Sequence, residues 1–150
     1  SVPMPYRFPD LVSAGVPAHE SLKDIELGSG DFFSLNLYLD DNEDYVVIPA
    51  YYNGGDNAVT IADAEAEEIT MSTYAYEPED QDVSIFGIRF GMTKDEVKTL
   101  LGEAEWDDDN YMEWLVIVSD SNYEGNFSIY FTDSEDGPVV SQADLDIREQ

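Results

Sequence analysis

Alternating apolar and polar positions recur along most of the chain and predict a β-rich fold. Such a run places apolar side chains on one face of a strand and polar side chains on the other, which is typical of half-buried strands. The pattern occurs at residues 33–39, 45–52, 69–76, 112–118, 126–132 and 139–147. Between the last two runs, Asp136-Gly137 predicts a tight hairpin, because both residue types tolerate the backbone angles of such a turn.

The segment 93–102 predicts the clearest helix. Glu96 follows Thr93 at the spacing of a capping box, in which each side chain satisfies a free backbone N–H of the other residue. Gly102 favours the left-handed conformation that ends many helices. A second short helix is predicted over 8–15, where Pro9 suits a first helical turn and Gly15 suits the end.

These elements predict an α+β fold, with short helices packed on one face of an antiparallel sheet or sheets. Their order divides the chain into an N-terminal β-rich half, 1–76, and a C-terminal half of helix plus antiparallel strands, 83–150. The acidic stretch 77–82 is the expected linker. Because each half contains a short helix followed by about three strands, we also expect that an internal repeat relates them.

The charge of the chain narrows the range of partners. Lys and Arg number 6 against 34 Asp and Glu, which gives a net charge of −28. A surface of this charge repels phosphate backbones and anionic lipid, so we expect no nucleic-acid partner. Basic protein patches, polycations and divalent cations are favoured instead, although solubility alone would also explain the charge.

The same composition bears on location. The chain of 150 residues has no cysteine, which excludes thiol nucleophiles, disulfides and Cys-based zinc sites. No apolar run is long enough to span a membrane. The chain opens at Ser1 without an initiator Met, so we expect a mature protein from which a leader or lipid anchor was removed. We therefore expect a secreted or cell-surface protein.

Catalytic signatures are not evident in the sequence. His19 is the only histidine and lies in a polar segment, where a solvated side chain is the simplest interpretation. Acidic residues are too numerous for any pair to indicate a carboxylate-based hydrolase. We therefore expect no enzyme activity and no cofactor.

The acidic run 40–44 is a weak candidate for a metal site. Asp40, Asn42 and Asp44 alternate as they do at the start of an EF-hand calcium loop. The later EF-hand positions do not follow, because Tyr45 and Tyr51 stand where glycine and glutamate are needed. A solvated hairpin tip is the alternative explanation of this run.

Tyrosines provide candidates for a binding surface. Tyr74 and Tyr76 share one side of a predicted strand, and Tyr130 shares a side with Ser128 on another strand. Aromatic ridges of this kind bind proteins and sugars, although tyrosine also favours strands for packing reasons alone.

The strongest resemblance lies in residues 90–97, Phe-Gly-Met-Thr-Lys-Asp-Glu-Val, followed by Leu100-Leu101-Gly102. This phrase resembles the strand-then-helix signature of small exported proteins and lipoproteins of Gram-positive bacteria. It is more distantly similar to β-lactamase-inhibitor-protein-like domains and to outer-membrane assembly lipoproteins of the SmpA/OmlA type. The resemblance implies a helix on an antiparallel sheet, export, lipid anchoring before maturation, and a binding role.

The leading hypothesis is a non-catalytic extracellular or cell-surface binding module. Its ligand would be a protein, a peptide or a wall polymer. The alternatives are an inhibitor of a secreted hydrolase, a calcium-dependent surface protein, and a carboxylate-based hydrolase.

Overall fold

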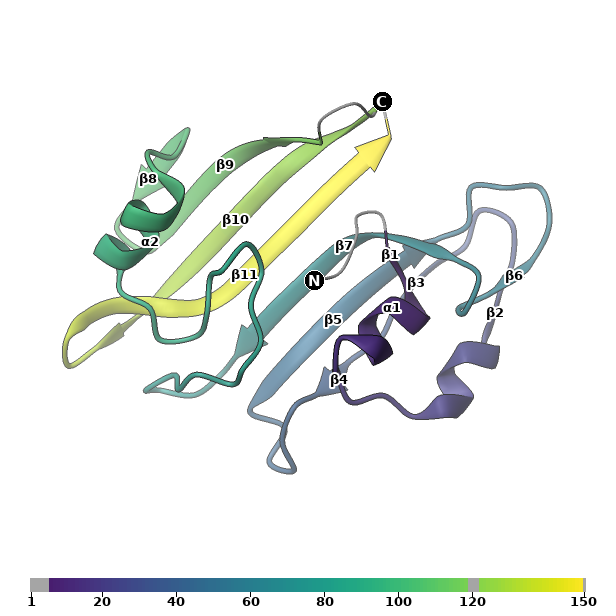
Figure 1. Ribbon diagram of the computed structural model, residues 1–150, viewed down its shortest axis with the longest axis horizontal. Helices are drawn as coiled ribbons and strands as arrows, with labels where there is room; N and C mark the ends of the chain where they lie inside the picture. The colour runs from purple at the N-terminus through teal and green to yellow at the C-terminus, as the bar shows by residue number, and fades with distance from the viewer. Residues whose placement is uncertain (1–5, 119–121, 150) are drawn as a thin grey trace.

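The computed structural model describes residues 6–118 and 122–149, and most of its strands join a single antiparallel sheet of nine strands (Figure 1). The antiparallel sheet expected from the alternating pattern is thus confirmed. The strands of this main sheet are β1 (Tyr6–Arg7), β3 (Phe32–Ser34), β4 (Leu37–Tyr38), β5 (Tyr45–Tyr52), β7 (Glu65–Thr73), β8 (Trp106–Asp108), β9 (Tyr111–Ile117), β10 (Tyr123–Ser134) and β11 (Gly137–Glu149). A small separate sheet pairs β2 (Glu26–Leu27) with β6 (Val59–Thr60).

Two distant parts of the chain meet in the middle of the main sheet. The strand order is β3-β5-β7-β11-β10-β9-β8, so β7 pairs directly with the last strand, β11. In this register Thr70 lies opposite Asp144 and Glu68 lies opposite Asp146. Strands from before and after the segment 77–82 therefore share one sheet. The division of the chain into halves 1–76 and 83–150 with the linker 77–82 stays a prediction.

The expected α+β fold with helices packed on the sheet is wrong. The fold is mostly β, with 46% of the described residues in strands or bridges and 14% in helices. The expected helix over 8–15 is only α1 (Phe8–Ser13), of 6 residues, and η1 (Glu20–Asp24) is a 3-10 turn. Of the helices within 6–118 and 122–149, only α2 (Lys94–Leu101) has the length expected of a regular helix, so these residues do not form two equivalent helix-plus-strand halves.

Irregular segments cover one face of the main sheet, in place of the helices that usually do so. Leu35, Ile61, Ile85, Ile88 and Phe90 lie outside helices and long strands, yet each is nearly or fully buried in the core. The helices add Phe8, Leu11 and Val97 to the same core. Burial of apolar surface does not depend on the secondary structure that supplies it. Loops can therefore cover a sheet as well as helices do.

The local geometry of α2 follows its sequence. Thr93 accepts a hydrogen bond from the backbone N–H of Glu96, and the capping box is present. Lys94 and Lys98 lie 2.6 and 3.0 Å from the carboxylate of Asp107 and tie α2 to β8. These hydrogen bonds hold the pKa of Asp107 below its usual range. The expected hairpin is also present, since β10 pairs with β11 across a turn at Asp136-Gly137.

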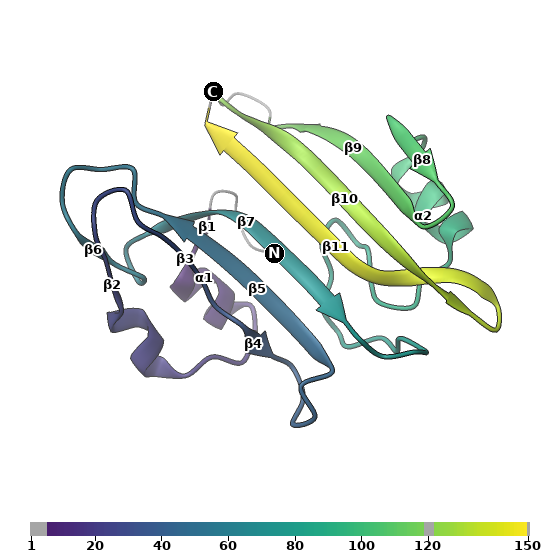
Figure 2. The same cartoon turned by 180° about the vertical axis from the view of Figure 1, so that it is seen from behind.

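The helices and covering segments all lie on one side of the main sheet. Figure 1 shows α1, α2 and the segment after β7 in front of the strands, and Figure 2 shows them behind. None of the helices in the described part of the chain is long and apolar enough to cross a bilayer. The leader or lipid anchor expected before Ser1 lies outside the described residues, so it stays a prediction.

Candidate functional site

The side of the main sheet that faces away from α1 and α2 is the candidate functional site, and we call it the open face (Figure 2). Its side chains come from alternate positions of the strands, between the residues that enter the core. The pairing register aligns them in rows across the strands. The open face consists mainly of Phe32, Tyr38, Tyr52, Glu68, Thr70, Ser72, Trp106, Tyr111, Glu113, Leu115, Glu124, Asn126, Ser128, Tyr130, Gln142, Asp144, Asp146 and Arg148.

The middle of the open face is acidic. Glu68 on β7 lies directly opposite Asp146 on β11, and Asp144 lies one row away, opposite Thr70. The hydroxyl of Thr70 donates a hydrogen bond of 2.6 Å to a carboxylate oxygen of Asp144. Like charges at adjacent positions of paired strands repel each other, so this arrangement is not explained by the needs of the sheet.

Burial and mutual repulsion change the protonation of this acidic centre. Burial, together with the charges of Asp144 and Asp146, raises the pKa of Glu68 to about 7. Burial also raises the pKa of Asp144, although the hydrogen bond from Thr70 opposes that shift. A carboxyl group that holds its proton near neutral pH is sensitive to any cation that approaches.

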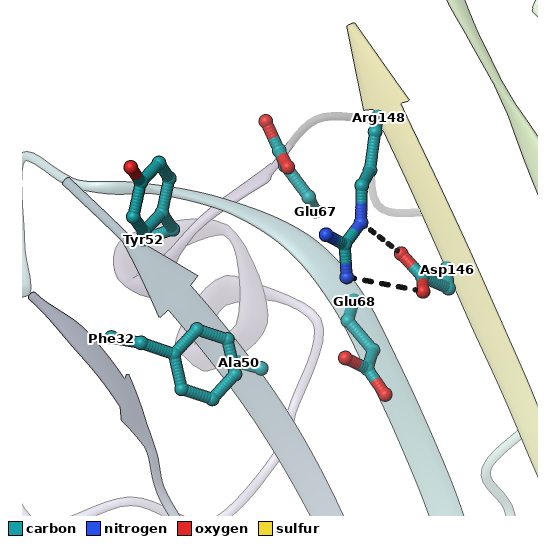
Figure 3. Close-up of a pocket in the computed structure, with 7 residues that line it drawn as sticks. All are labelled: Phe32, Ala50, Tyr52, Glu67, Glu68, Asp146 and Arg148. Carbon is teal, nitrogen blue, oxygen red and sulfur yellow. Dashed lines mark hydrogen bonds and ion pairs between the residues drawn. The ribbon is translucent and has the colours of Figure 1, made fainter. Parts of the chain in front are cut away.

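Arg148 is the basic residue of the open face, and it lies at the border of the acidic centre (Figure 3). Its guanidinium forms an ion pair with Asp146, with an Nε–Oδ1 distance of 3.1 Å. That hydrogen bond raises the pKa of Arg148. A shallow hollow of about 470 Å³ opens here, and Figure 3 shows Phe32, Tyr52 and Glu68 around it.

Aromatic side chains border the acidic centre on the β3–β5 side. Phe32 pairs with Tyr52 across β3 and β5, and their exposed fractions are 60% and 49%. Tyr38 on β4 lies farther along the same border. Exposed aromatic rings are costly in water unless a partner covers them.

A second aromatic border lies on the β8–β10 side. The rings of Tyr111 and Tyr130 are 5.0 Å apart, and the hydroxyl of Tyr111 lies 3.0 Å from the carboxylate of Glu113. Burial raises the pKa of Tyr111. Trp106 lies opposite Glu113 and is 58% exposed, whereas Trp114, on the opposite face of β9, is 9% exposed. The acidic centre therefore lies between two aromatic borders.

The covered face of the sheet carries a different hollow, of about 770 Å³. Its floor includes Met71 and Leu145 from the central strands, and its walls include Val16 after α1 and Phe86 in the segment before α2. This hollow is mainly apolar and lies over the core. A volume of this size suits a small ligand, and Gln81, Asp82 and Ser84 are among the residues that line it.

His19 serves as the cap of η1. Its Nδ1 accepts a hydrogen bond from the backbone N–H of Ser21 and lies 2.7 Å from the Ser21 hydroxyl. Nucleophilic catalysis needs a base that a third group orients beside a nucleophile in a cleft. The exposed contact between His19 and Ser21 is instead the local hydrogen bonding of a helix start.

Comparison of the chain with protein-family models, with curated proteins and with solved structures finds no match. The resemblance to exported lipoproteins and to β-lactamase-inhibitor-protein-like domains therefore stays a prediction.

The weak metal candidates lie in the loop between β4 and β5. The carboxylate of Asp40 accepts hydrogen bonds from the backbone N–H groups of Asp44 and Tyr45, at 3.0 and 3.3 Å. The carbonyl of Asp44 accepts one from the hydroxyl of Thr73. Asp40 and Asp44 thus shape the hairpin, as does Glu43 with its φ of 59°. Within 6–118 and 122–149, no group of three or more Asp, Glu or His side chains is placed to hold a metal ion.

The three candidate tyrosines lie on different parts of the fold. Tyr130 is on the open face, in the same row as Ser72 and Gln142. Tyr74 and Tyr76 follow the end of β7 and are 88% and 78% exposed. Only Tyr130 therefore belongs to the site proposed below.

The sequence did not single out the acidic centre or Trp106. Alternation around Ile69 and Leu145 does place Glu68, Asp144 and Asp146 on the polar sides of their strands. What is missing from the sequence is the pairing of β7 with β11, which brings these carboxyl groups together. The signal available in the sequence was that two separate strands carry acidic residues on their polar sides: Glu68 on one, and Asp144 and Asp146 on the other.

Proposed function

We propose that this protein is a non-catalytic extracellular or cell-surface binding module that binds a macromolecular partner on its open face. The observation that carries the proposal is the acidic centre of that face between two borders of exposed aromatic side chains. Interfaces commonly combine large aromatic contacts with a few polar groups that select the partner. A face kept only for solubility has no need of exposed Trp106, Phe32 and Tyr52.

The exported location is part of the same proposal. It is supported by the resemblance of residues 90–97 to exported proteins. The inhibitor of a secreted hydrolase, which the sequence left open, would use a surface of the same kind. It is therefore a narrower form of this proposal, with an enzyme as the partner.

A selection from a random-peptide display library tests the proposed surface without assuming a ligand. Asn126 is exposed in the middle of the open face, so Asn126→Arg places a long side chain across it. Asn57 is exposed in the loop before β6, so Asn57→Arg is a matched control with the same change of charge. Both variants are first compared with the wild type by thermal melting to establish that they fold.

We expect selected peptides to bind the wild type and Asn57→Arg alike, and to bind Asn126→Arg at least about tenfold more weakly, a loss of about 1.4 kcal/mol. Equal binding to the two variants would show that the peptides use another surface. That result would refute the open face as the binding site.

A further inference from the structure

We propose that the partner of the open face is an extended basic polypeptide segment with Lys or Arg at alternate positions. This inference rests on the proposed function and adds the chemistry and spacing of the ligand. It is argued from the charge of the open face, the spacing of its carboxyl groups, the state of those groups, and the aromatic borders.

The charge of the open face is strongly one-sided. Arg148 is the only basic residue among those that define it. The acidic residues of the same set are Glu68, Glu113, Glu124, Asp144 and Asp146. An aligned excess of carboxylates attracts a basic partner and repels acidic ones, so charge complementarity selects the class of ligand.

The spacing of the carboxyl groups matches an extended chain. Asp144 and Asp146 are two residues apart on β11 and project from the same face, so their backbone positions are about 6.6–6.8 Å apart. Side chains on one face of an extended peptide repeat at the same interval. A peptide that lies along β11 can therefore place alternate Lys or Arg side chains over consecutive carboxylates.

Arg148 pairs with Asp146, whereas Glu68 and Asp144 have no ion pair of their own within the described part of the chain. Glu68 faces Asp144, Asp146 and Arg148 from β11 and lies beside Glu67 on its own strand, whereas its β5 neighbour is Ala50. Partial burial disfavours the charged forms of Glu68 and Asp144. A partner that brings positive charge into this setting favours those charged forms, so binding and loss of the Glu68 proton support each other.

The aromatic borders suit the same ligand. A guanidinium stacks on the face of Trp or Tyr, and the aliphatic stems of Lys and Arg cover apolar surface. Trp106 adjoins Glu113 across the β8–β9 pairing, and Tyr52 lies beside the hollow that contains Glu68. Each border thus combines a ring with a nearby carboxylate. A bare metal ion or a small polyamine has too little apolar surface to cover such rings.

The test measures the binding of labelled peptides by fluorescence anisotropy at near-physiological salt, where diffuse attraction is screened beyond about 8 Å. One peptide alternates Arg with Thr, and its isomer has the same composition with all Arg residues adjacent. The protein variants change carboxylates to amides of the same shape. The open-face variant is Glu68→Gln with Glu113→Gln and Asp144→Asn, and the control is Asp41→Asn with Asp56→Asn and Glu103→Gln, at exposed loop positions.

We expect the alternating peptide to bind the wild type at least about tenfold more tightly than it binds the open-face variant. The control variant has the same formal net charge as the open-face variant, and we expect it to change the affinity by less than about twofold. We also expect the alternating peptide to bind more tightly than its isomer. Circular dichroism and melting curves confirm that both variants fold.

Equal loss of affinity in the two variants, or equal binding of the two peptide isomers, would overturn the inference in favour of diffuse charge attraction. Spermine that displaces the alternating peptide at equal concentration would overturn it as well, because only charge would then be recognised. If library peptides that depend on Asn126 contain no excess of Lys or Arg, the inference fails while the proposed function stands. If selected peptides do not depend on Asn126, the proposed function fails.

Discussion

The two faces of the main sheet are built from the same strands, yet they follow different rules. On β10, Phe127, Ile129 and Phe131 enter the core and are nearly fully buried, while Asn126 and Tyr130 on the other face are exposed. The covered face contains the buried apolar side chains that a stable core requires, beside the hollow of about 770 Å³. The open face contains adjacent acidic groups and exposed rings, which stability alone does not require. This contrast supports the proposal that the open face is the functional surface.

Two substitutions on β10, one on each face of the sheet, should differ most in their effect on stability. We expect Phe127→Ala to lower the free energy of unfolding by about 3–5 kcal/mol, because it removes a buried ring that packs against Trp114 and Phe86. Asn126→Ala, the neighbouring position on the open face, is expected to change it by less than about 0.5 kcal/mol. Urea denaturation measures both. Similar losses would mean that the open face is as structural as the core.

Gly125→Ala tests how tightly the chain is packed where β10 approaches β11. A methyl group added at Gly125 would clash with the backbone carbonyl of Asp146, which cannot move without disturbing the sheet. We expect a loss of about 1–3 kcal/mol in the free energy of unfolding. Gly55→Ala is a loop control, because an added methyl there would meet only the side chain of Asn53. A neutral Gly125→Ala would show that β11 has room to shift.

The covering layer can be tested through the start of α2. Thr93→Ala removes the side-chain acceptor for the backbone N–H of Glu96, and we expect it to lower the free energy of unfolding by about 1 kcal/mol. Thr99→Ala on the exposed side of the same helix is the matched control, and alanine's higher helix propensity should make it neutral or slightly stabilising. Equal melting temperatures for the two variants would contradict a capping role for Thr93.

The smallest expected effect concerns the acidic centre and depends on pH. The pKa of Glu68 is about 7 in the folded chain against 4.5 for an unperturbed glutamate, so the folded state retains the proton more strongly. Its contribution to stability is therefore full below pH 4.5 and is lost as the pH rises through 7. At pH 8, Glu68→Gln should raise the free energy of unfolding by up to about 1 kcal/mol, after allowance for solvent screening.

Thermal melting of this variant and the wild type from pH 4 to pH 8 measures the difference. The gain should disappear near pH 4, where the glutamate is protonated in both states. Glu124→Gln, an exposed change on the same face, provides the control. If Glu68→Gln raises the free energy of unfolding equally at every pH, the effect does not come from the proton on Glu68.

The same contrast explains what the sequence could predict. Alternation and the Asp136-Gly137 turn predicted the long strands, and Thr93 with Glu96 predicted α2, because each signal acts between neighbours in the chain. The fold class was wrong because Ile85, Ile88 and Phe90 cover the core from an irregular segment that has no periodicity. The acidic centre joins residues on β7 and β11, and the hydrogen bond between Thr70 and Asp144 spans 74 positions. No local pattern encodes such a pairing.

We propose that a partner binds the open face, and the two tryptophans of the chain provide a direct test of that claim. Trp106 lies on the open face and Trp114 lies on the covered face, so their indole N–H signals in a ¹⁵N spectrum report on opposite sides of the sheet. During a titration with the alternating Arg–Thr peptide, we expect the Trp106 indole signal to shift and the Trp114 signal to stay in place. A shift of Trp114 alone, or of neither signal while the peptide binds, would contradict the claim.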